Sequence, residues 1–286
     1  MKKTMLIAVA GVAVVAVGCN QTADVKEGTT QQSDVTLEEV FNNAVERQAN
    51  IKSVKASMTM TQAIEMNNGT ETLKTDTKSD MTMDVIIEPM QLFVDGTIAI
   101  TDPTNNQDMN MPLKMYLTEK DGFYLFEQTS NAWFKLPKEG YESILEQSGM
   151  STSTAQQQLN LLKDYVSDFT FEQTDSDYVL TLNADDDKFN QLIKDQMAQT
   201  LPQESEELTK ELDNITIDNT VYQLTIDKQT FDTKIVDMDM VLTVDAEGQS
   251  VKIDQKSTVT YDEVNTLSEI TVPQEVLDSA QELPQQ

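Results

Sequence analysis

A two-residue alternation of apolar and polar side chains constrains the fold of this chain more than any other feature of its sequence. Between positions 53 and 61, Val54, Ala56, Met58 and Met60 alternate with Ser, Lys and Thr residues. This period is typical of a β-strand that buries one face. Similar segments, which we interpret as further strands, lie at residues 81–85, 92–100, 113–118, 123–128, 132–136, 168–171, 178–182, 214–226, 233–244 and 248–261.

Short turns join these segments. Asn68-Gly69 and Asp121-Gly122 are dipeptides that favour β-hairpins. The chain shows no regular alternation of strands with helices, so a parallel sheet is not expected. The sequence therefore predicts a mainly antiparallel sheet within a single domain that spans residues 36–286.

Helical patterns are inserted between the strands. Thr36 and Glu39 have the spacing of a capping box. Leu37, Val40 and Phe41 begin an apolar series at helical spacing, which continues with Ala44, Val45 and Ile51. Further helices are predicted at about residues 141–165, 186–199 and 274–280, with a short one after Pro202. Together with the strands, they place the chain in the α+β class.

The N-terminus has the pattern of a bacterial secretion signal. Lys2 and Lys3 precede an apolar run at residues 5–17, which is shorter than the roughly 20 residues that span a membrane. The next residues, Gly18 and Cys19, end a segment that resembles the lipobox of bacterial lipoproteins, with Ala16 in place of the usual Leu. The resemblance implies cleavage between Gly18 and Cys19, and acylation of the Cys19 thiol. We therefore expect a palmitate-type anchor on the outer face of a cytoplasmic membrane.

Composition narrows what the mature chain can do. Without Lys2 and Lys3 it keeps 18 basic and 49 acidic residues, a formal charge of −31, and Arg47 is its only arginine. This balance argues against a nucleic-acid partner, because binding to phosphates depends on Lys and Arg. The chain has no histidine, and Cys19 is its only cysteine, so the usual general base, zinc ligand and thiol nucleophile are lacking. We expect no enzyme activity, metal or cofactor.

Residues 19–35 are polar and contain little to bury, so the sequence predicts a lipidated cysteine followed by a flexible tether. Because the acidic domain would be repelled by anionic headgroups, we expect it to stand off the membrane surface.

A broader resemblance follows from the order of these features. A lipobox, a polar tether and a capped helix lead into alternating strands of the type Ser57-Met58-Thr59-Met60-Thr61. An aromatic strand at residues 131–137 and an Ile-x-Val-Pro ending at residues 270–273 complete the pattern. The chain thus resembles uncharacterised lipoproteins of Gram-positive bacteria, which are in turn similar to LolA/LppX-like carriers. The resemblance implies a strongly curved antiparallel sheet, a half-barrel, with helices on its concave side and acyl chains held between them.

Methionines are the main candidates for ligand contact. The chain has 15 of them, many in Met-x-Met pairs that a strand would display on one face. Such pairs can fill a core, line a deformable lipid cavity, or bind copper(I) through thioethers, which no histidine would assist. The pairs are 58/60, 81/83, 109/111 and 238/240, and the cavity candidates are Met58, Met60, Met81, Met83, Met238, Met240 and Trp133.

Other motifs have simpler interpretations. Trp133 and Phe134, near Tyr124 and Phe126, either pack on the sheet or line a ligand entrance. The acidic run at residues 185–187 is expected to cap a helix, because the spaced ligands of a calcium loop are missing. The leading hypothesis is a surface lipoprotein that binds a lipid or another apolar ligand. The alternative is a lipoprotein with a structural or protein-interaction role and no ligand, and its protein partner cannot be named from the sequence.

Overall fold

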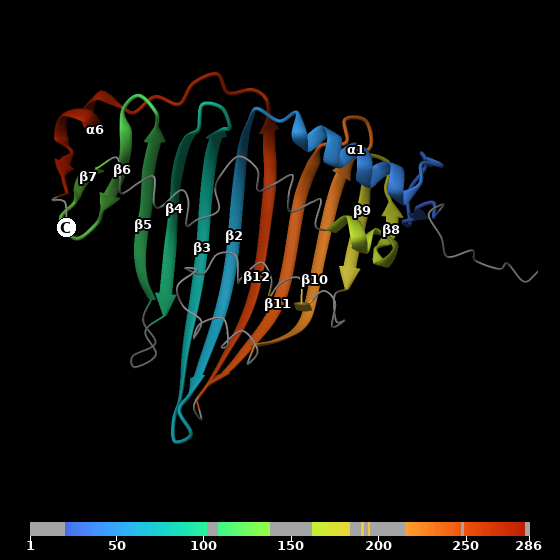
Figure 1. Cartoon of the computed structure of the whole chain (residues 1–286), viewed down its shortest axis with the longest axis horizontal. Helices are drawn as coiled ribbons and strands as arrows, with labels where there is room; N and C mark the ends of the chain where they lie inside the picture. Colours follow the sequence, from blue (N-terminus) through green and yellow to red (C-terminus); the bar gives the residue numbers. More distant parts are fainter. Residues whose placement is uncertain are drawn as a thin grey trace, which may run out of the picture.

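The alternating segments pair into one large, open and curled β-sheet in the computed structural model, which describes residues 21–101, 108–137, 162–183, 190–191, 194, 215–246 and 249–283 (Figure 1). Among these residues the sheet has 13 strands, in the order β1-β8-β9-β10-β11-β12-β2-β3-β4-β5-β6-β7-β13. The strands are β1 (Asp24–Val25), β2 (Ser53–Asn67), β3 (Thr72–Ile86), β4 (Gln91–Thr101), β5 (Asp108–Thr118), β6 (Gly122–Glu127), β7 (Ala132–Leu136), β8 (Thr170–Gln173), β9 (Asp177–Asn183), β10 (Ile215–Asp227), β11 (Thr233–Ala246), β12 (Gln249–Val264) and β13 (Gln281–Glu282).

Two meanders make up this sheet. Strands β2 to β7 form one and β8 to β12 form the other, and the antiparallel pairing of β12 with β2 joins them. The predicted antiparallel arrangement is confirmed for the interior of the sheet. Only the short strands β1 and β13 add in parallel, at the two edges. The first and last described strands of the chain therefore close opposite edges of the same sheet.

The central strands are longer than the sequence predicts. β3 begins at Thr72, nine residues before the start of the predicted segment at residue 81. The positions that would carry the apolar alternation in this stretch are occupied by Thr75, Thr77 and Ser79. Hydroxyl side chains at inward positions therefore hide the strand from a hydrophobicity pattern, and the β2–β3 hairpin extends beyond its neighbours (Figure 1).

Strand register assigns the side chains of the sheet to two faces. Met58 pairs with Met81, for example, and Met83 with Val94, so these residues share one face. We call this the apolar face and the opposite one the polar face. The apolar face includes even positions 54–66 of β2, odd positions 73–85 of β3, even positions 92–100 of β4, odd positions 109–117 of β5, even positions 222–226 of β10, even positions 236–244 of β11 and odd positions 251–261 of β12.

Helix α1 (Leu37–Ala49) packs on the apolar face near the β8–β10 end of the sheet. The predicted capping box is present: Glu39 N–H donates to Thr36 Oγ1 over 3.3 Å, and Thr36 N–H donates to Glu39 Oε2 over 2.9 Å. The bond from Thr36 N–H, together with one from the Thr36 hydroxyl to the same carboxylate over 2.8 Å, lowers the pKa of Glu39. The buried stripe of α1 includes Val40 and Phe41, which join Phe171 and other residues in a core cluster. The amphipathic helix is therefore confirmed.

Helix α6 (Gln274–Ser279) packs at the other end of the sheet, beside β6 and β7 (Figure 1). Val276 contacts the cluster that contains Tyr124, Tyr116 and Trp133, all of which belong to the polar face. The two α-helices within the described residues therefore lie on opposite faces of the sheet. The expectation that the helices share the concave side is wrong for this pair. The polar face carries aromatic side chains at this end of the sheet, and α6 packs on them. Residues 162–168 form a 3₁₀ turn, η1 (Leu162–Asp168), next to α1.

Residues 21–35, which we call the strap, do not form the flexible tether that their polarity predicts. β1 pairs with β8, Ala23 is buried, and Leu37 N–H donates to the carbonyl oxygen of Gln21 over 2.8 Å. Hydrogen bonds, more than apolar burial, hold the strap, whose apolar contacts with the core come from Ala23 and Val35. A composition argument does not detect such bonds, and this accounts for the wrong prediction.

Gln173 holds the strap from inside the domain. Its side chain is 2% exposed, and Nε2 donates to the carbonyl oxygens of Ala23 and Ser33 over 3.1 Å each. Oε1 accepts from Ser33 N–H over 2.9 Å and from Lys228 Nζ over 2.8 Å. Burial lowers the pKa of Lys228. Backbone N–H groups of the strap bind the Asp175 carboxylate and lower its pKa.

Candidate functional site

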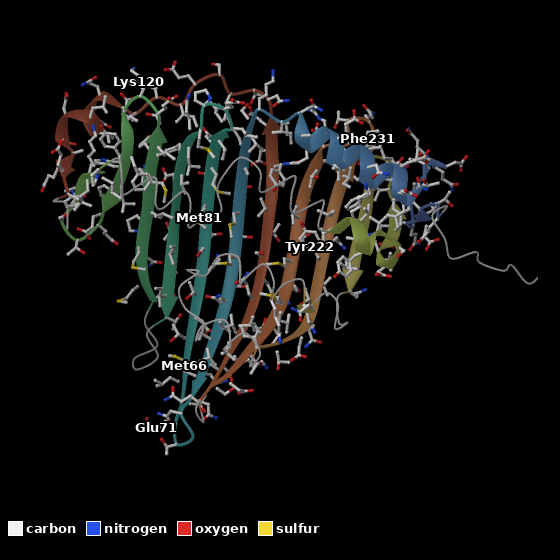
Figure 2. The ribbon with its side chains drawn as sticks, in the orientation of Figure 1. Met66, Glu71, Met81, Lys120, Tyr222 and Phe231 are labelled. Carbon is white, nitrogen blue, oxygen red and sulfur yellow. The ribbon has the colours of Figure 1, made fainter. Side chains whose placement is uncertain are left out.

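The Met-x-Met pairs come together on the apolar face. All four pairs named above occupy it, and Met58 lies directly opposite Met81 across the β2–β3 ladder. Met238 and Met60 lie in one row, separated by Ser257 of β12. The methionine candidates for a ligand-contacting surface are therefore brought together by the fold. Figure 2 locates Met81 on the central strands and Met66 towards the tip of the β2–β3 hairpin.

Apolar residues of other types extend this surface. A buried cluster around Leu92, Val94 and Leu117 packs against Met81, Met83 and Met115. A second cluster around Ile217 and Leu242 packs against Met240. Some side chains remain largely exposed at the far end of the face, with values of 43% for Met66, 46% for Leu73, 56% for Met109 and 40% for Met111.

Charged residues are excluded from the centre of this face. On β2 to β5, every described residue assigned to the apolar face is uncharged. The same holds for the even positions 236–244 of β11 and the odd positions 251–261 of β12. Burial raises the pKa of Tyr222 and of Tyr261, so these phenols stay neutral on the apolar face. In a chain of formal charge −29, this separation makes the face suitable for an apolar ligand.

The polar face carries the charges of the same strands. Lys114 pairs with Asp95 over 2.8 Å and Lys256 with Asp239 over 2.9 Å. In each pair the hydrogen bond to the carboxylate raises the pKa of the lysine. The four side chains of these ion pairs are 38–63% exposed, so the polar face is a solvated surface of the sheet.

Trp133 does not join the methionines. It lies on the polar face, where its ring centroid is 5.7 Å from that of Tyr116 and 5.5 Å from that of Phe126. These rings, with residues of α6, line a pocket of about 310 Å³. The aromatic cluster was expected either to pack on the sheet or to line a ligand entrance. Its contacts are those of packing, against the sheet and α6.

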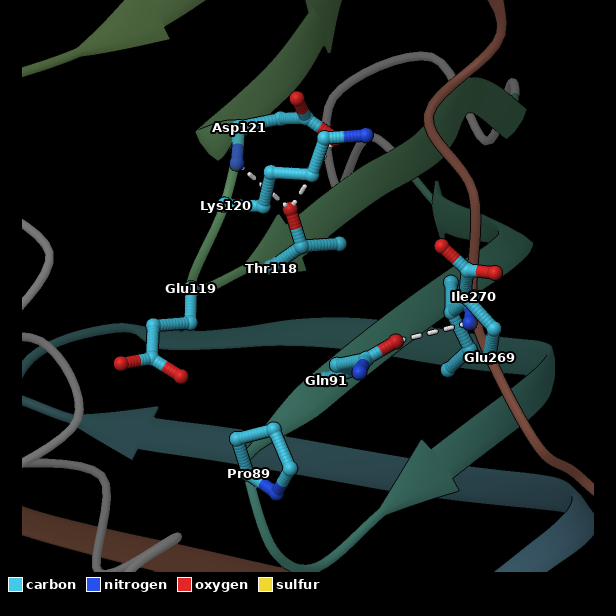
Figure 3. A pocket seen from close by; sticks show the side chains of 8 residues that line it. All are labelled: Pro89, Gln91, Thr118, Glu119, Lys120, Asp121, Glu269 and Ile270. Atoms are coloured by element: carbon cyan, nitrogen blue, oxygen red, sulfur yellow. Dashed lines mark hydrogen bonds between the residues drawn. The ribbon is translucent and has the colours of Figure 1, made fainter.

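A second pocket, of about 390 Å³, lies where the segment after β12 crosses the ends of β4 and β5 (Figure 3). Ile270 N–H donates to Gln91 Oε1 over 2.7 Å, and Asp121 N–H donates to Thr118 Oγ1 over 3.0 Å. These bonds tie the pocket walls to each other. Its lining is charged or polar except for two residues, and comprises Pro89, Gln91, Thr118, Glu119, Lys120, Asp121, Glu269 and Ile270.

Several sequence predictions fall outside the described residues. They include the cleavage and lipidation residues Gly18 and Cys19, and the acidic run at residues 185–187. Within the described ranges, no three acidic or cysteine side chains gather as a metal site. In that same part of the chain, no helix is long and apolar enough to cross a membrane.

The sequence prediction selected methionines but missed the polar side chains among them. Gln62 Nε2 donates to Gln255 Oε1 over 3.2 Å on the apolar face, and Ser79, 2% exposed, lies in the next row. The alternation of side chains along β2 could have identified Gln62, because even-numbered residues of this strand share one face. Extending the alternation from Met58 and Met60 through Gln62 would have placed the glutamine on this face.

A model of a family of unknown function, DUF6612, matches residues 36–281. No curated protein matches the chain. Among solved structures, the chain is similar to a DUF1329 family protein from Desulfovibrio piger, with 13% identity, coverage of 81% of this chain and 95% of that one, and a TM-score of 0.24. It is also similar to a LolA superfamily protein from Nitrosomonas europaea, with 10% identity, coverage of 85% and 97%, and a TM-score of 0.21.

Lipovitellin, in a structure described by its lipid–protein interactions, is a third similar protein, with 9% identity, coverage of 78% of this chain and 26% of that one, and a TM-score of 0.33. At TM-scores this low, no ligand or activity is transferred from these proteins.

Proposed function

We propose that this chain, which belongs to the DUF6612 family of unknown function, binds an apolar ligand against the methionine-rich face of its sheet. The observation that carries the proposal is the separation of charge. Strands β2 to β5 hold their charged residues on the polar face and display methionine and aliphatic side chains on the other. Such a separation supports a surface that meets hydrocarbon.

Methionine suits this role for a physical reason. Its unbranched and polarizable side chain adapts to irregular apolar shapes. Each square ångström of apolar surface removed from water contributes about 25 cal/mol, so an alkyl chain laid over several methionines can be held without a polar contact. Because the face is broad, the ligand would be a long-chain molecule such as a lipid.

We further propose that the protein works as a lipoprotein on the outer face of a bacterial cytoplasmic membrane. The lipobox-like segment ending at Gly18 and Cys19 supports this. Two acyl chains on Cys19 would hold the domain firmly, since each buried methylene contributes about 0.8 kcal/mol. Metabolic labelling with a palmitate analogue should be lost in Cys19→Ala, and labelling that persists in this variant would overturn the anchor.

Ligand binding is tested with the full chain and an alkyl probe that carries an uncharged pyrene group. We expect saturable binding that Met60→Glu weakens by at least about tenfold, because the carboxylate would be desolvated by the probe. Thr61→Glu is the matched control, since Thr61 is exposed on the polar face of the same strand. Failure of the wild-type chain to bind the probe would contradict the proposal.

The alternative is a structural or protein-interaction role without a ligand. Four exposed apolar side chains in two groups, one on the β2–β3 hairpin and one at the start of β5, favour it, because exposed apolar patches often mark interaction sites. They are Met66, Leu73, Met109 and Met111. If the probe does not bind, these two groups are the surfaces on which to search for a protein partner.

A further inference from the structure

A band of uncharged polar side chains crosses the apolar face. Gln255 of β12 pairs in register with Gln62 of β2, which pairs with Thr77 of β3. In the next row, Ser257 and Ser79 lie on either side of Met60. Most side chains above and below the band are apolar, including Met58 and Met81 on one side and Ile64 and Ile253 on the other, where Thr75 of β3 is the polar exception.

Thr220 extends this band onto β10. The register of β10 with β11 has a bulge between Asp218 and Val221, where Asn219 adopts a positive φ of 51°. Alternation from Tyr222 puts Thr220 on the apolar face, opposite Met240, which pairs with Gln255. We call Thr220, Gln255, Gln62, Thr77, Ser257 and Ser79 the neutral polar band.

The hydroxyl of Thr220 points to a missing partner. Thr220 is 2% exposed, and its Oγ1 has no hydrogen-bond partner within the part of the chain that the structure describes. A buried hydroxyl without a partner is uncommon in folded proteins, and a bound water or ligand usually satisfies it. The bulge therefore holds a hydrogen-bonding group at the rim of a surface that is otherwise suited to hydrocarbon.

The charge of a suitable polar group is limited by the surroundings of the band. Burying an ion away from a partner is strongly unfavourable. On β2 to β5, the described residues of the apolar face include no lysine or arginine that could neutralise a carboxylate or phosphate. Glutamine, threonine and serine can instead donate to and accept from ester, hydroxyl or amide groups.

Resting on the proposed function, we infer that the ligand is an amphiphile with an uncharged polar group. That group would lie against the neutral polar band and hydrogen-bond with Thr220 and the Gln62–Gln255 pair, while its alkyl chain covers the methionines. Lipids with a buried anionic headgroup would be excluded. The band therefore selects among apolar ligands by their headgroup.

Three ligands with matched C18 chains test this inference in competition with the pyrene probe on the full chain. They are monoolein, oleate at pH 8, and octadecene. We expect monoolein to displace the probe at a concentration at least about tenfold lower than either oleate or octadecene requires, about 1.4 kcal/mol of selectivity. Oleate that competes as well as monoolein would overturn the inference.

Two variants separate headgroup recognition from general packing. Thr220→Val keeps the shape of the side chain and removes its hydroxyl, and Gln62→Leu removes one member of the amide pair. Each should weaken monoolein binding by three- to tenfold and leave octadecene binding unchanged. Thr59→Val on the polar face is the control and should change neither. An equal loss for both ligands, or no loss for monoolein, would overturn the inference.

The same experiment distinguishes failure of this inference from failure of the proposed function. If the probe binds and the three ligands compete equally, the apolar face binds hydrocarbon and the neutral polar band has no role in selection. If neither the probe nor any of the three ligands binds, the proposed function itself is wrong, and the inference is lost with it.

Discussion

The two faces of the sheet are built from the same strands and differ almost completely in chemistry. Along β2, Met58 and Met60 face one side, whereas Ser57, Thr59 and Thr61 face the other. β3 repeats the contrast, with methionine and valine on the apolar face and lysine and aspartate on the polar face. A single alternating sequence thus produces one surface of mainly apolar side chains and one of charged and polar side chains.

This contrast specifies strand register more than it adds stability. Exposed ion pairs such as Lys55 with Glu263 contribute at most about 1 kcal/mol each. A slip of one residue along any central strand, however, would move its charges onto the apolar face and its methionines into solvent. The acidic and basic residues of the polar face therefore act mainly by making alternative registers unfavourable.

The largest expected effect comes from moving a charge to the apolar face. Val94, 5% exposed on β4, packs in the cluster with Met83 and Met115. Val94→Asp should lower the free energy of unfolding by about 3 kcal/mol or more, because the carboxylate would be buried without a partner. Urea denaturation followed by circular dichroism measures this.

Ala99→Asp is the matched control for that substitution. It places the same carboxylate on the same strand, but on the polar face and opposite Lys78. The change in unfolding free energy should stay within about 0.5 kcal/mol. Equal destabilisation by the two variants would show that the faces are not as different as their side chains suggest.

Substitution of two glutamines, Gln173 and Gln223, compares the stability contributed by buried and by half-buried hydrogen bonds. Gln173, buried behind the strap, makes four side-chain hydrogen bonds. Gln173→Ala should lower the free energy of unfolding by about 2–4 kcal/mol, because Lys228 and backbone groups of the strap lose their partners. Gln223 on the polar face donates to Thr181 over 2.8 Å, and its loss should cost about 1 kcal/mol. Chemical denaturation ranks the two variants.

Limited proteolysis adds a local test of the same comparison. In Gln173→Ala the strap should become cleavable within residues 21–35 before the rest of the domain, whereas Gln223→Ala should leave it protected. A strap that is cleaved equally fast in the wild-type chain would restore the flexible tether predicted from composition.

The sequence predicts those parts of the fold in which chemistry repeats. Apolar alternation located the strands around Met58, Met83 and Val94, and the Thr36–Glu39 spacing located the start of α1. Alternation failed where inward positions are polar, as at Ser79. It also gave no information on the strap, because its hydrogen bonds come from Gln173 and Lys228, which are distant in sequence.

The candidate site was predictable only in part, for a related reason. Counting methionines identifies the residues but not their common face, which depends on the register between strands from both halves of the chain. Trp133 shows the limit. Its aromatic neighbours left both packing on the sheet and a ligand entrance open, and its strand parity puts it on the polar face under α6.

Gly96 provides a smaller test of packing on the apolar face. A Cβ atom at this position would lie 2.6 Å from Met81 Cγ, and it would also approach the backbone of Asp80 too closely. Gly96→Ala should therefore destabilise the sheet by about 1–3 kcal/mol through overpacking. Thr97→Ala, on the polar face of the same strand, should change stability by less than about 0.5 kcal/mol. Thermal denaturation of both variants tests whether the Met81 side chain packs too tightly against position 96 to make room for a methyl group.

The smallest expected effect is at Glu127, the last residue of β6, whose side chain is on the apolar face at the edge of the sheet. Glu127 accepts N–H bonds from Thr129 over 2.7 Å and from Ser130 over 2.8 Å, and the Ser130 hydroxyl also donates to it. These bonds, those from Ser130 above all, lower the pKa of Glu127 from 4.5 to about 2. Because the folded-state pKa lies below the unfolded one, the stabilisation is complete above pH 4.5 and is lost as the pH falls towards 2. An NMR titration of the Glu127 carboxyl should give the low value, and Glu127→Gln should flatten the pH dependence of stability in that interval alone. A pKa near 4.5 would mean that this turn does not hold the carboxylate, and that the charge at the rim is simply solvated.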